Sequence, residues 1–182
     1  MTAIERANPV YLGLGSNMGD REENLSKAVK QMGVKLIIKE LSSIYETDPV
    51  GYEQQPKFLN AVVSGTTELD PFELLDFIKG LENALGRVPN FQNGPRTIDI
   101  DILFYNNIVL NTPQLTIPHP RLAERAFVLV PLSEIAPNLI CPFRQKKVSV
   151  LLANVEDRDG VKRVGKLKGS DKIQEGQANS VR

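Results

Sequence analysis

The stretch that most limits how this chain can fold is residues 94–104, Gly-Pro-Arg-Thr-Ile-Asp-Ile-Asp-Ile-Leu-Phe. From Thr97 onward, β-branched and large apolar residues alternate with polar ones after two helix-breaking residues, which predicts a β-strand. The face expected to enter a core holds Ile98, Ile100, Ile102 and Phe104. Asp99 and Asp101 fall together on the other face, about 6.6–6.8 Å apart along the strand.

Two interpretations fit this pair of carboxylates. Alternating acidic residues are common on the solvated face of an antiparallel sheet. Alternatively, the pair holds a hard divalent cation, most simply Mg²⁺, which takes oxygen ligands and often keeps phosphates as its other partners. The turn Gly94-Pro95-Arg96 favours the second interpretation, because it brings a guanidinium suited to phosphate into the same strand.

Composition indicates an ordinary globular protein: 182 residues, 41% hydrophobic and 24% charged, enough for one domain with a substantial core. The sequence has no apolar run of eighteen residues and no apolar stretch resembling a signal peptide in residues 1–8, so we expect no membrane association. Cys141 is the only cysteine, which excludes an intramolecular disulfide and a cysteine-rich zinc site. We therefore expect a cytoplasmic protein.

Charge is unevenly distributed along the chain. Residues 1–143 contain 12 basic and 17 acidic residues, a net charge of −5, whereas residues 144–182 contain 10 basic and 5 acidic residues, a net charge of +5. An acidic body is a poor general binder of nucleic acid, so we expect no nucleic-acid partner.

The predicted elements follow a β-α-β-β-α-β order. Strands are expected at 10–14, at 35–47 as one irregular strand, at 58–68 and from 97. One helix is expected to begin after Asp20, with Glu23 three residues on, and to end at Gly33. A second begins at Asp70-Pro71 and ends at Gly86. This order predicts an α+β fold, a ferredoxin-like sandwich with a mainly antiparallel sheet, plus an extra hairpin and C-terminal helices.

The remaining segments give weaker signals. The glycines in residues 13–19 match neither a dinucleotide-binding nor a Walker pattern, so we interpret them as a turn after the first strand. Residues 106–107 are expected to turn the chain into a hairpin with residues 108–110, and residues 122–136 to form helical pieces broken at Pro131. We expect the domain to span residues 1–154 and the polar, basic residues 155–182 to be loosely ordered and dispensable for catalysis.

The side chains available for chemistry favour phosphoryl transfer. His119 is the only histidine and lies between two prolines, which suits a ligand contact better than proton shuttling, although a local structural role fits equally well. Residues 87–94 are polar, rich in helix breakers and suited to a mobile lid. Cationic side chains available for phosphates are Lys79, Arg87, Arg96, Arg121 and Arg125. Together with Asp99 and Asp101 they suit a reaction in which the protein positions groups and neutralises charge.

Residues 94–102 also closely resemble the signature of the 6-hydroxymethyl-7,8-dihydropterin pyrophosphokinases of folate biosynthesis. The resemblance runs from about Val10 to Pro142. Its further motifs are Leu14-Gly15-Ser16-Asn17, Tyr45-Glu46-Thr47, Phe58-Leu59-Asn60-Ala61, Leu85-Gly86-Arg87, residues 116–121 and Glu134-Ile135-Ala136-Pro137.

The resemblance implies a ferredoxin-like fold and transfer of pyrophosphate from ATP to the pterin hydroxymethyl group, with release of AMP. It implies that Asp99 and Asp101 bridge two Mg²⁺ ions and that Arg96 and Arg87 act in catalysis by neutralising the transferring group. Implied ATP contacts are Lys79, Glu82, Arg96, Ile102, Thr116, His119 and Arg125. Implied pterin contacts are Thr47, Val50, Phe58, Asn60 and Phe127.

Some positions depart from the family pattern or keep a structural interpretation. Pro89, Gln92 and Asn93 stand where relatives often have an arginine, a basic residue and a tryptophan. Phe58 and Phe127 also suit ordinary core aromatics, and Glu82 suits a solvated position on its helix.

Two other functions stay open at this point. Paired aspartates on a ferredoxin-like sheet also occur in palm domains that transfer nucleotidyl groups and release pyrophosphate. A sensing domain of the same fold would bind a small molecule without turnover.

The substrates that the resemblance implies are ATP and the pterin. We also expect the protein to be a monomer.

Overall fold

The structure is a computed structural model and describes residues 7–168 and Ser170. Its helices and strands are, in chain order, β1(Asn8–Ser16), α1(Arg21–Met32), β2(Leu36–Leu41), β3(Ile44–Thr47), β4(Phe58–Thr67), α2(Pro71–Ala84), β5(Asp99–Tyr105), β6(Leu110–Asn111), β7(Thr116–Ile117), the 3₁₀ turn η2(Leu122–Glu124), α3(Ala126–Ile135), β8(Ile140–Cys141), β9(Lys146–Lys147), α4(Val148–Asn154), the 3₁₀ turn η3(Arg158–Gly160) and β10(Lys162–Gly165).

In the described part of the chain, six strands form one antiparallel sheet. Five of them follow the order β10-β3-β4-β1-β5, and β2 pairs with the other half of β4. The pairs β6–β7 and β8–β9 form separate two-stranded ribbons. The predicted α+β class with a mainly antiparallel sheet is confirmed.

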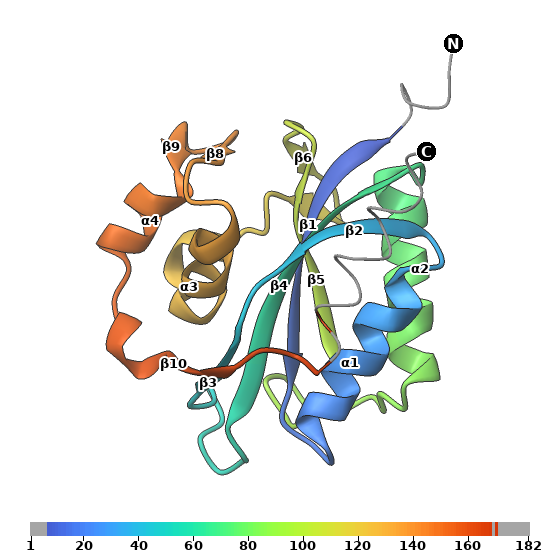
Figure 1. Cartoon of the computed structure of the whole chain (residues 1–182), viewed down its shortest axis with the longest axis vertical. Helices are drawn as coiled ribbons and strands as arrows, with labels where there is room; N and C mark the ends of the chain where they lie inside the picture. Colours follow the sequence, from blue (N-terminus) through green and yellow to red (C-terminus); the bar gives the residue numbers. More distant parts are fainter. Residues whose placement is uncertain (1–6, 169, 171–182) are drawn as a thin grey trace.

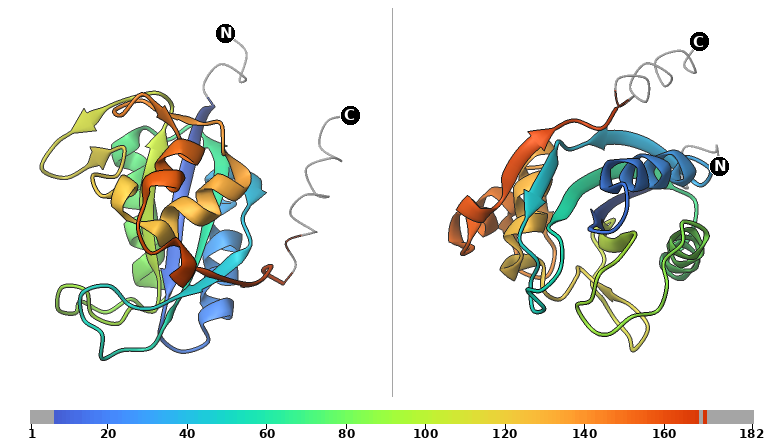
Figure 2. Two further views of the ribbon diagram at one scale, coloured as in Figure 1. Left: turned by 90° about the vertical axis from the view of Figure 1, so that its left-hand side faces the viewer. Right: turned by 90° about the horizontal axis from the view of Figure 1, so that it is seen from below.

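Helices cover both faces of the sheet. α1 and α2 lie against one face, and α3 and α4 lie against the other (Figures 1 and 2). The sheet face toward α1 and α2 contributes residues such as Leu12, Ile100 and Ile102 to the larger apolar cluster. The opposite face contributes Val62 and Phe104 to a second cluster with α3 and α4.

The two predicted helices begin where their capping residues predict. The Asp20 side chain accepts a hydrogen bond from the backbone N–H of Glu23. Asp70 and Glu73 form a reciprocal capping box, and Pro71 occupies the first helical position. These local signals fix the N-terminal ends of α1 and α2.

β5 carries the two aspartates as predicted, but one face assignment is wrong. The register with β1 shifts between Tyr11 and Leu12, so that Leu103 is an extra residue on β5. This bulge turns Phe104 to the face of α3, away from Ile98, Ile100 and Ile102. Period-two alternation along one strand cannot reveal an inserted residue in a pairing.

Other boundaries also differ from the predictions. β1 continues to Ser16, so the turn occupies residues 17–20. Residues 35–47 form two strands, because residues 42–43 hydrogen-bond to Val62 and Glu134 and interrupt the ladder. The predicted hairpin of residues 108–110 with β5 is wrong, since β6 pairs with β7. The predicted break at Pro131 is wrong as well, because α3 runs through it.

The expectation of loose order from Val155 is wrong for residues 155–168. β10 pairs with β3 and forms one edge of the sheet. Val155 is buried in the apolar cluster beside α3, and Leu167 is buried in the cluster beside α1 and α2. Residues 171–182 of the predicted tail lie outside the described residues.

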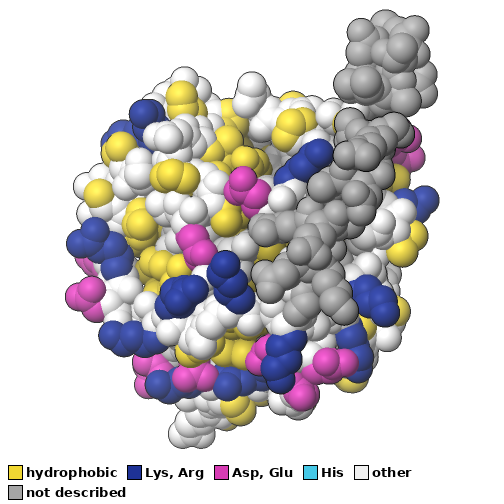
Figure 3. Space-filling model, in the orientation of Figure 1, with side chains coloured by type: hydrophobic (Ala, Val, Ile, Leu, Met, Phe, Trp, Pro, Cys, Tyr) yellow, Lys and Arg dark blue, Asp and Glu magenta, His cyan; other side chains and the backbone are white. Residues whose placement is uncertain are grey.

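On the face shown in Figure 3, basic and acidic side chains are interspersed over the surface. None of the helices in the described residues is both long and apolar enough to cross a membrane.

Candidate active site

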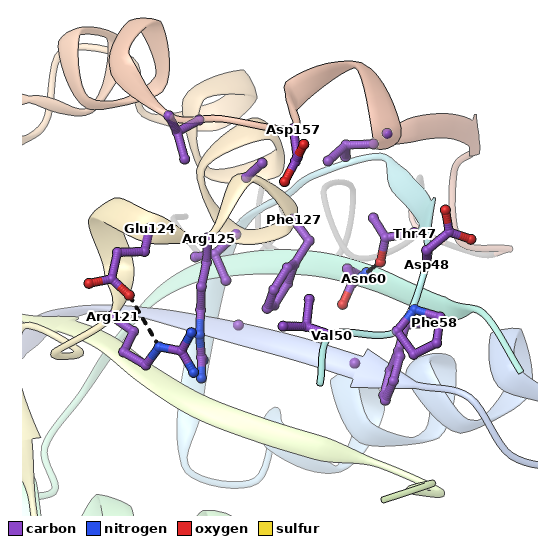
Figure 4. A pocket seen from close by; sticks show the side chains of 18 of the residues that line it. Thr47, Asp48, Val50, Phe58, Asn60, Arg121, Glu124, Arg125, Phe127 and Asp157 are labelled. Atoms are coloured by element: carbon purple, nitrogen blue, oxygen red, sulfur yellow. Dashed lines mark hydrogen bonds and ion pairs between the residues drawn. The ribbon is translucent and has the colours of Figure 1, made fainter. Parts of the chain in front are cut away.

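A cavity of about 760 Å³ opens above the strands that carry the predicted site residues. Its walls come from β1, β3 with its following loop, β4, β5, the start of α3 and residues 155–161 (Figure 4). Asp99 and Asp101 line this cavity together with Arg96 and Arg125. The cavity therefore joins the aspartate pair to the predicted pterin residues.

Beside the aspartates, two glycines of β1 form part of the cavity wall. Gly15 pairs with Asp99 and Gly13 pairs with Asp101. A Cβ atom on Gly15 would lie 3.3 Å from Oδ1 of Asn60, so a larger residue would crowd that amide in the cavity. The expected turn at these two glycines is therefore wrong, because both lie on β1 and line the cavity.

Two arginines neutralise Asp99. Arg96 Nη1 lies 2.8 Å from Oδ2, and Arg87 Nη1 lies 3.1 Å from Oδ1. All three side chains are about one quarter exposed, so these ion pairs are partly screened by solvent. Both arginines that the resemblance assigned to catalysis thus meet at one carboxylate.

Glu82 is 1% exposed, so its interpretation as a solvated helix residue is wrong. Its carboxylate accepts a 2.7 Å hydrogen bond from the backbone N–H of Ile100, which lies between the two aspartates on β5. It also accepts a 2.6 Å bond from Arg87 Nη1 and a 3.2 Å bond from Lys79 Nζ. Glu82 therefore connects α2, the start of the lid and the aspartate strand.

Asp101 is less well neutralised. Arg125 Nη1 lies 3.4 Å from Oδ2, and Nε2 of His119 lies 3.9 Å from the same oxygen. Burial, followed by the negative charge of Asp99, raises the pKa of the Asp101 carboxyl above its ordinary value. Burial and the nearby Arg125 lower the pKa of His119 to about 4, so this imidazole is neutral at physiological pH.

The residues assigned to pterin binding all line the cavity: Thr47, Val50, Phe58, Asn60 and Phe127. Asn60 Nδ2 donates a 2.7 Å hydrogen bond to Thr47 Oγ1, and both residues are buried. Phe58 and Phe127 are half-buried, and Phe127 lies between Arg125 and the Thr47–Asn60 pair in Figure 4. Arg125 also lies over the Phe127 ring, with Cζ 5.6 Å from its centroid.

The residues assigned to ATP are more dispersed. Lys79 is half exposed and paired with Glu82. The Ile102 side chain is buried in the cluster beside α1 and α2, on the face opposite the aspartates, which matches a packing role. Thr116 lies on β7, where its hydroxyl donates a 3.4 Å hydrogen bond to Asn111. Arg96 and Arg125 are the two assigned ATP residues that line the cavity.

The aspartate pair fits a hard cation by its chemistry. Two carboxylates share one cavity wall, and burial, followed by the charge of Asp99, raises the pKa of Asp101 despite the nearby Arg125. Among the described residues, no group of three or more acidic, histidine or cysteine side chains is placed to hold a metal. Mg²⁺ commonly binds through one or two carboxylates and substrate phosphates, so two protein ligands suffice.

Comparison with known families matches residues 11–137 to 7,8-dihydro-6-hydroxymethylpterin-pyrophosphokinase (HPPK). This chain belongs to the HPPK family.

Individual relatives agree with the HPPK assignment. The chain is 52% identical over 130 residues to the 2-amino-4-hydroxy-6-hydroxymethyldihydropteridine pyrophosphokinase of Bacillus subtilis, covering 70% of this chain and 78% of that protein. It is 47% identical over 137 residues to the same-named protein of Aquifex aeolicus, covering 75% of this chain and 86% of that protein. Folic acid synthesis protein FOL1 of Dictyostelium discoideum is 48% identical over 135 residues, which are 74% of this chain but 20% of that protein.

Solved structures show that the HPPK fold is shared. The wild-type HPPK-DHPS of Plasmodium falciparum with pteroate superposes with a TM-score of 0.68 at 19% identity, covering 86% of this chain and 46% of that chain. At this level of identity the likeness supports the fold alone. The predicted family and its ferredoxin-like fold are confirmed.

The positions expected to depart from the HPPK pattern, Pro89, Gln92 and Asn93, lie in the lid, residues 87–94. Phe91 packs edge to face on Tyr52, with ring centroids 5.0 Å apart. The backbone carbonyl of Asn93 accepts a 2.7 Å hydrogen bond from Gln55 Nε2. The lid therefore contacts the β3–β4 loop through a ring pair and a backbone carbonyl.

Asn17 is a further residue of the site without an assigned role in the sequence analysis. It is buried, its Oδ1 accepts a 2.7 Å bond from the Arg96 N–H, and its Nδ2 donates to Gln55 and to the Pro56 carbonyl. Asn17 thus fixes the start of the aspartate strand against the β3–β4 loop. In the sequence, only its position within the Leu14–Asn17 motif indicated that Asn17 belongs to the site.

Proposed function

We propose that this chain transfers the pyrophosphoryl group of ATP to the hydroxymethyl oxygen of 6-hydroxymethyl-7,8-dihydropterin, giving the pterin diphosphate and AMP. The observation that carries the proposal is the composition of one cavity. At one end two carboxylates meet arginines, and at the other a buried amide and hydroxyl lie among aromatic side chains. Such a cavity offers separate places for a metal-bound polyphosphate and a flat polar ring.

The pterin end of the cavity suits a fused ring with donors and acceptors along its edge. Asn60 uses one amide hydrogen on Thr47, which leaves its other donor and its carbonyl oxygen for the ring edge. Phe58 and Phe127 offer faces and edges for stacking on the ring. Val50 is 55% exposed at the cavity mouth, where a bound ring would cover it.

At the phosphate end, Asp99 and Asp101 would hold two Mg²⁺ ions. When bound, the metal polarises the phosphoryl oxygens and neutralises charge that develops on them. Arg96 and Arg87 already contact Asp99, so they lie within reach of phosphates bound at that carboxylate. Their guanidinium groups would neutralise the transferring group and so act as catalytic residues.

ATP would contact Lys79, Thr116, His119 and Arg125. In the reaction an oxygen–phosphorus bond forms between the hydroxymethyl oxygen and the β-phosphorus. The bond from that phosphorus to the α,β-bridging oxygen breaks, AMP leaves with that oxygen, and the proton of the hydroxymethyl group is released to solvent.

The test is to incubate the purified chain with ATP, 6-hydroxymethyl-7,8-dihydropterin and Mg²⁺ and to resolve the nucleotides. We expect one AMP for each pterin diphosphate, and we expect excess EDTA to stop the reaction. ADP as the stoichiometric product would contradict pyrophosphoryl transfer. Release of pyrophosphate would instead favour nucleotidyl transfer, and pterin binding without turnover would favour a sensing domain.

A further inference from the structure

A polar cluster outside the cavity joins two of the elements that form its walls, α3 and β3, to the C-terminal strand β10. Glu134, in the last turn of α3, accepts hydrogen bonds from the backbone N–H of Ser43 at 3.0 Å and from its hydroxyl at 2.8 Å. The same carboxylate accepts a 2.6 Å hydrogen bond from the Tyr45 hydroxyl. None of these three residues belongs to the described cavity lining.

The proposed pterin function does not account for this cluster, yet the cluster is linked to the pterin residues by geometry. Phe127 and Glu134 are seven residues apart on α3, so they lie on the same side of the helix. On β3, Tyr45 and Thr47 are two residues apart and face the same side of the sheet. Glu134 therefore joins the C-terminal end of α3 to the start of β3. The N-terminal end of α3 carries Phe127 and the end of β3 carries Thr47, and both residues line the cavity.

The C-terminal strand joins the same cluster. Arg163 lies opposite Tyr45 in the β10–β3 register, and its Nε donates a 2.9 Å hydrogen bond to Ser43 Oγ. Residues 155–161, which lead into β10, line the cavity beside Phe127. The cluster thus connects α3, β3 and β10 at a single buried serine, which is 0% exposed.

We propose that Glu134 is a positioning residue for the pterin end of the cavity, acting through Ser43 and Tyr45, with Arg163 extending the same network to the C-terminal wall. This inference rests on the proposed function, because it assigns the affected end of the cavity to the pterin. At the phosphate end Arg125 precedes α3, but the two aspartates and Glu82 lie on β5 and α2, and the hydrogen bonds of the cluster do not extend to these two elements. Loss of Glu134 therefore weakens pterin binding without an equal effect on ATP.

The experiment compares Glu134→Ala, Glu134→Gln, Tyr45→Phe and Arg163→Ala with the wild-type chain. Matched controls are Ser133→Ala on the same helix and Lys162→Ala on the same strand. Dissociation constants for 6-hydroxymethylpterin and for Mg²⁺–ATP are measured separately, and KM for each substrate and kcat are measured in the complete reaction. Thermal melting, recorded for every variant, sets an assay temperature at which each remains folded.

For Glu134→Ala we expect about a tenfold weaker affinity for the pterin, because Phe127 and Thr47 are then held less firmly in the cavity wall before the ligand binds. The affinity for ATP is expected to change less than about twofold. Glu134→Gln retains one acceptor oxygen and should recover part of the loss. Tyr45→Phe and Arg163→Ala should show smaller effects of the same kind, and both controls should match wild type.

Equal losses of affinity for the pterin and for ATP would show a merely structural role and overturn the inference. A lowered melting temperature with unchanged pterin affinity would do the same. If Glu134→Ala does not fold, unchanged pterin affinity in both Glu134→Gln and Tyr45→Phe overturns it. A wild-type chain that binds the pterin but forms no AMP contradicts the proposed function alone. Normal turnover in wild type, with normal pterin binding in the variants, contradicts this inference alone.

Discussion

The two aspartates of β5 have different surroundings although they lie two residues apart. Asp99 forms ion pairs with two arginines at 2.8 and 3.1 Å, whereas the contact of Asp101 with Arg125 is 3.4 Å. Burial and Asp99 raise the pKa of Asp101. A cation shared by the pair would therefore relieve Asp101 more than Asp99, while the arginines of Asp99 become available to phosphates.

Replacing either Asp99 or Asp101 by alanine is expected to reduce turnover by about a thousandfold or more, because half of the proposed metal ligands would be lost. The measurement is the rate of AMP formation at saturating Mg²⁺. Both side chains are partly exposed, so we expect each variant to stay folded by circular dichroism.

Lys57→Ala is a suitable control for these substitutions. Lys57 forms an exposed ion pair with Asp48, and this pair includes neither Asp99 nor Asp101. A near-normal rate in either aspartate variant would show that the metal assignment is wrong.

Glu82→Ala is expected to destabilise the protein. The substitution leaves the buried N–H of Ile100 without its acceptor and removes one of the two acidic partners of Arg87, at a cost of about 1–3 kcal/mol. Glu82→Gln keeps one acceptor oxygen and should lose less. Urea denaturation measures the free energy of unfolding, and an unchanged value for the alanine variant would contradict the role of this carboxylate.

At the scale of elements, the sequence predicts what depends on neighbouring residues and misses what depends on distant pairing. Asp20 and Asp70 mark helix starts because a cap acts within one turn. The bulge at Leu103 depends on how β5 pairs with β1, which lies about ninety residues earlier in the chain. Pro131 does not break α3, because packing of the helix on β4 overrides the local preference.

The candidate site shows the same division. The aspartates and Arg96 could be predicted from one strand, because alternation and the preceding turn are local. The position of Glu82 could not, since its burial depends on α2 reaching the outer edge of β5. The cavity wall formed by residues 155–161 could not be predicted either. These residues are mostly polar, so the sequence shows no periodic apolar pattern that would indicate packing.

At the scale of the whole molecule, residues 155–168 connect the two apolar clusters across one edge of the sheet. Val155 and Val161 pack on the cluster beside α3, β10 pairs with β3, and Leu167 is buried beside α1 and α2. The segment is therefore part of the domain, although its charge and composition differ from those of the preceding residues.

Truncation after Asn154 is accordingly expected to impair the protein, contrary to the expectation from sequence. Loss of Leu167 burial and exposure of the β3 edge should lower the free energy of unfolding by about 3 kcal/mol or more. Chemical denaturation and pterin affinity would measure the effect. A chain ending at Ser170 is the matched comparison, and equal stability of the two chains would contradict the role assigned to β10.

The position of β5 at the edge of the sheet has a consequence for solubility. An unpaired strand edge exposes N–H and C=O groups to which strands of other molecules can bind. On β5 the Ile100 N–H is bonded to the Glu82 carboxylate, and the Leu103 carbonyl accepts a 3.2 Å bond from the His119 N–H. The Glu82 carboxylate, which also binds Arg87 of the lid, occupies the Ile100 N–H. It therefore makes this edge of β5 less available for pairing with other copies of the chain.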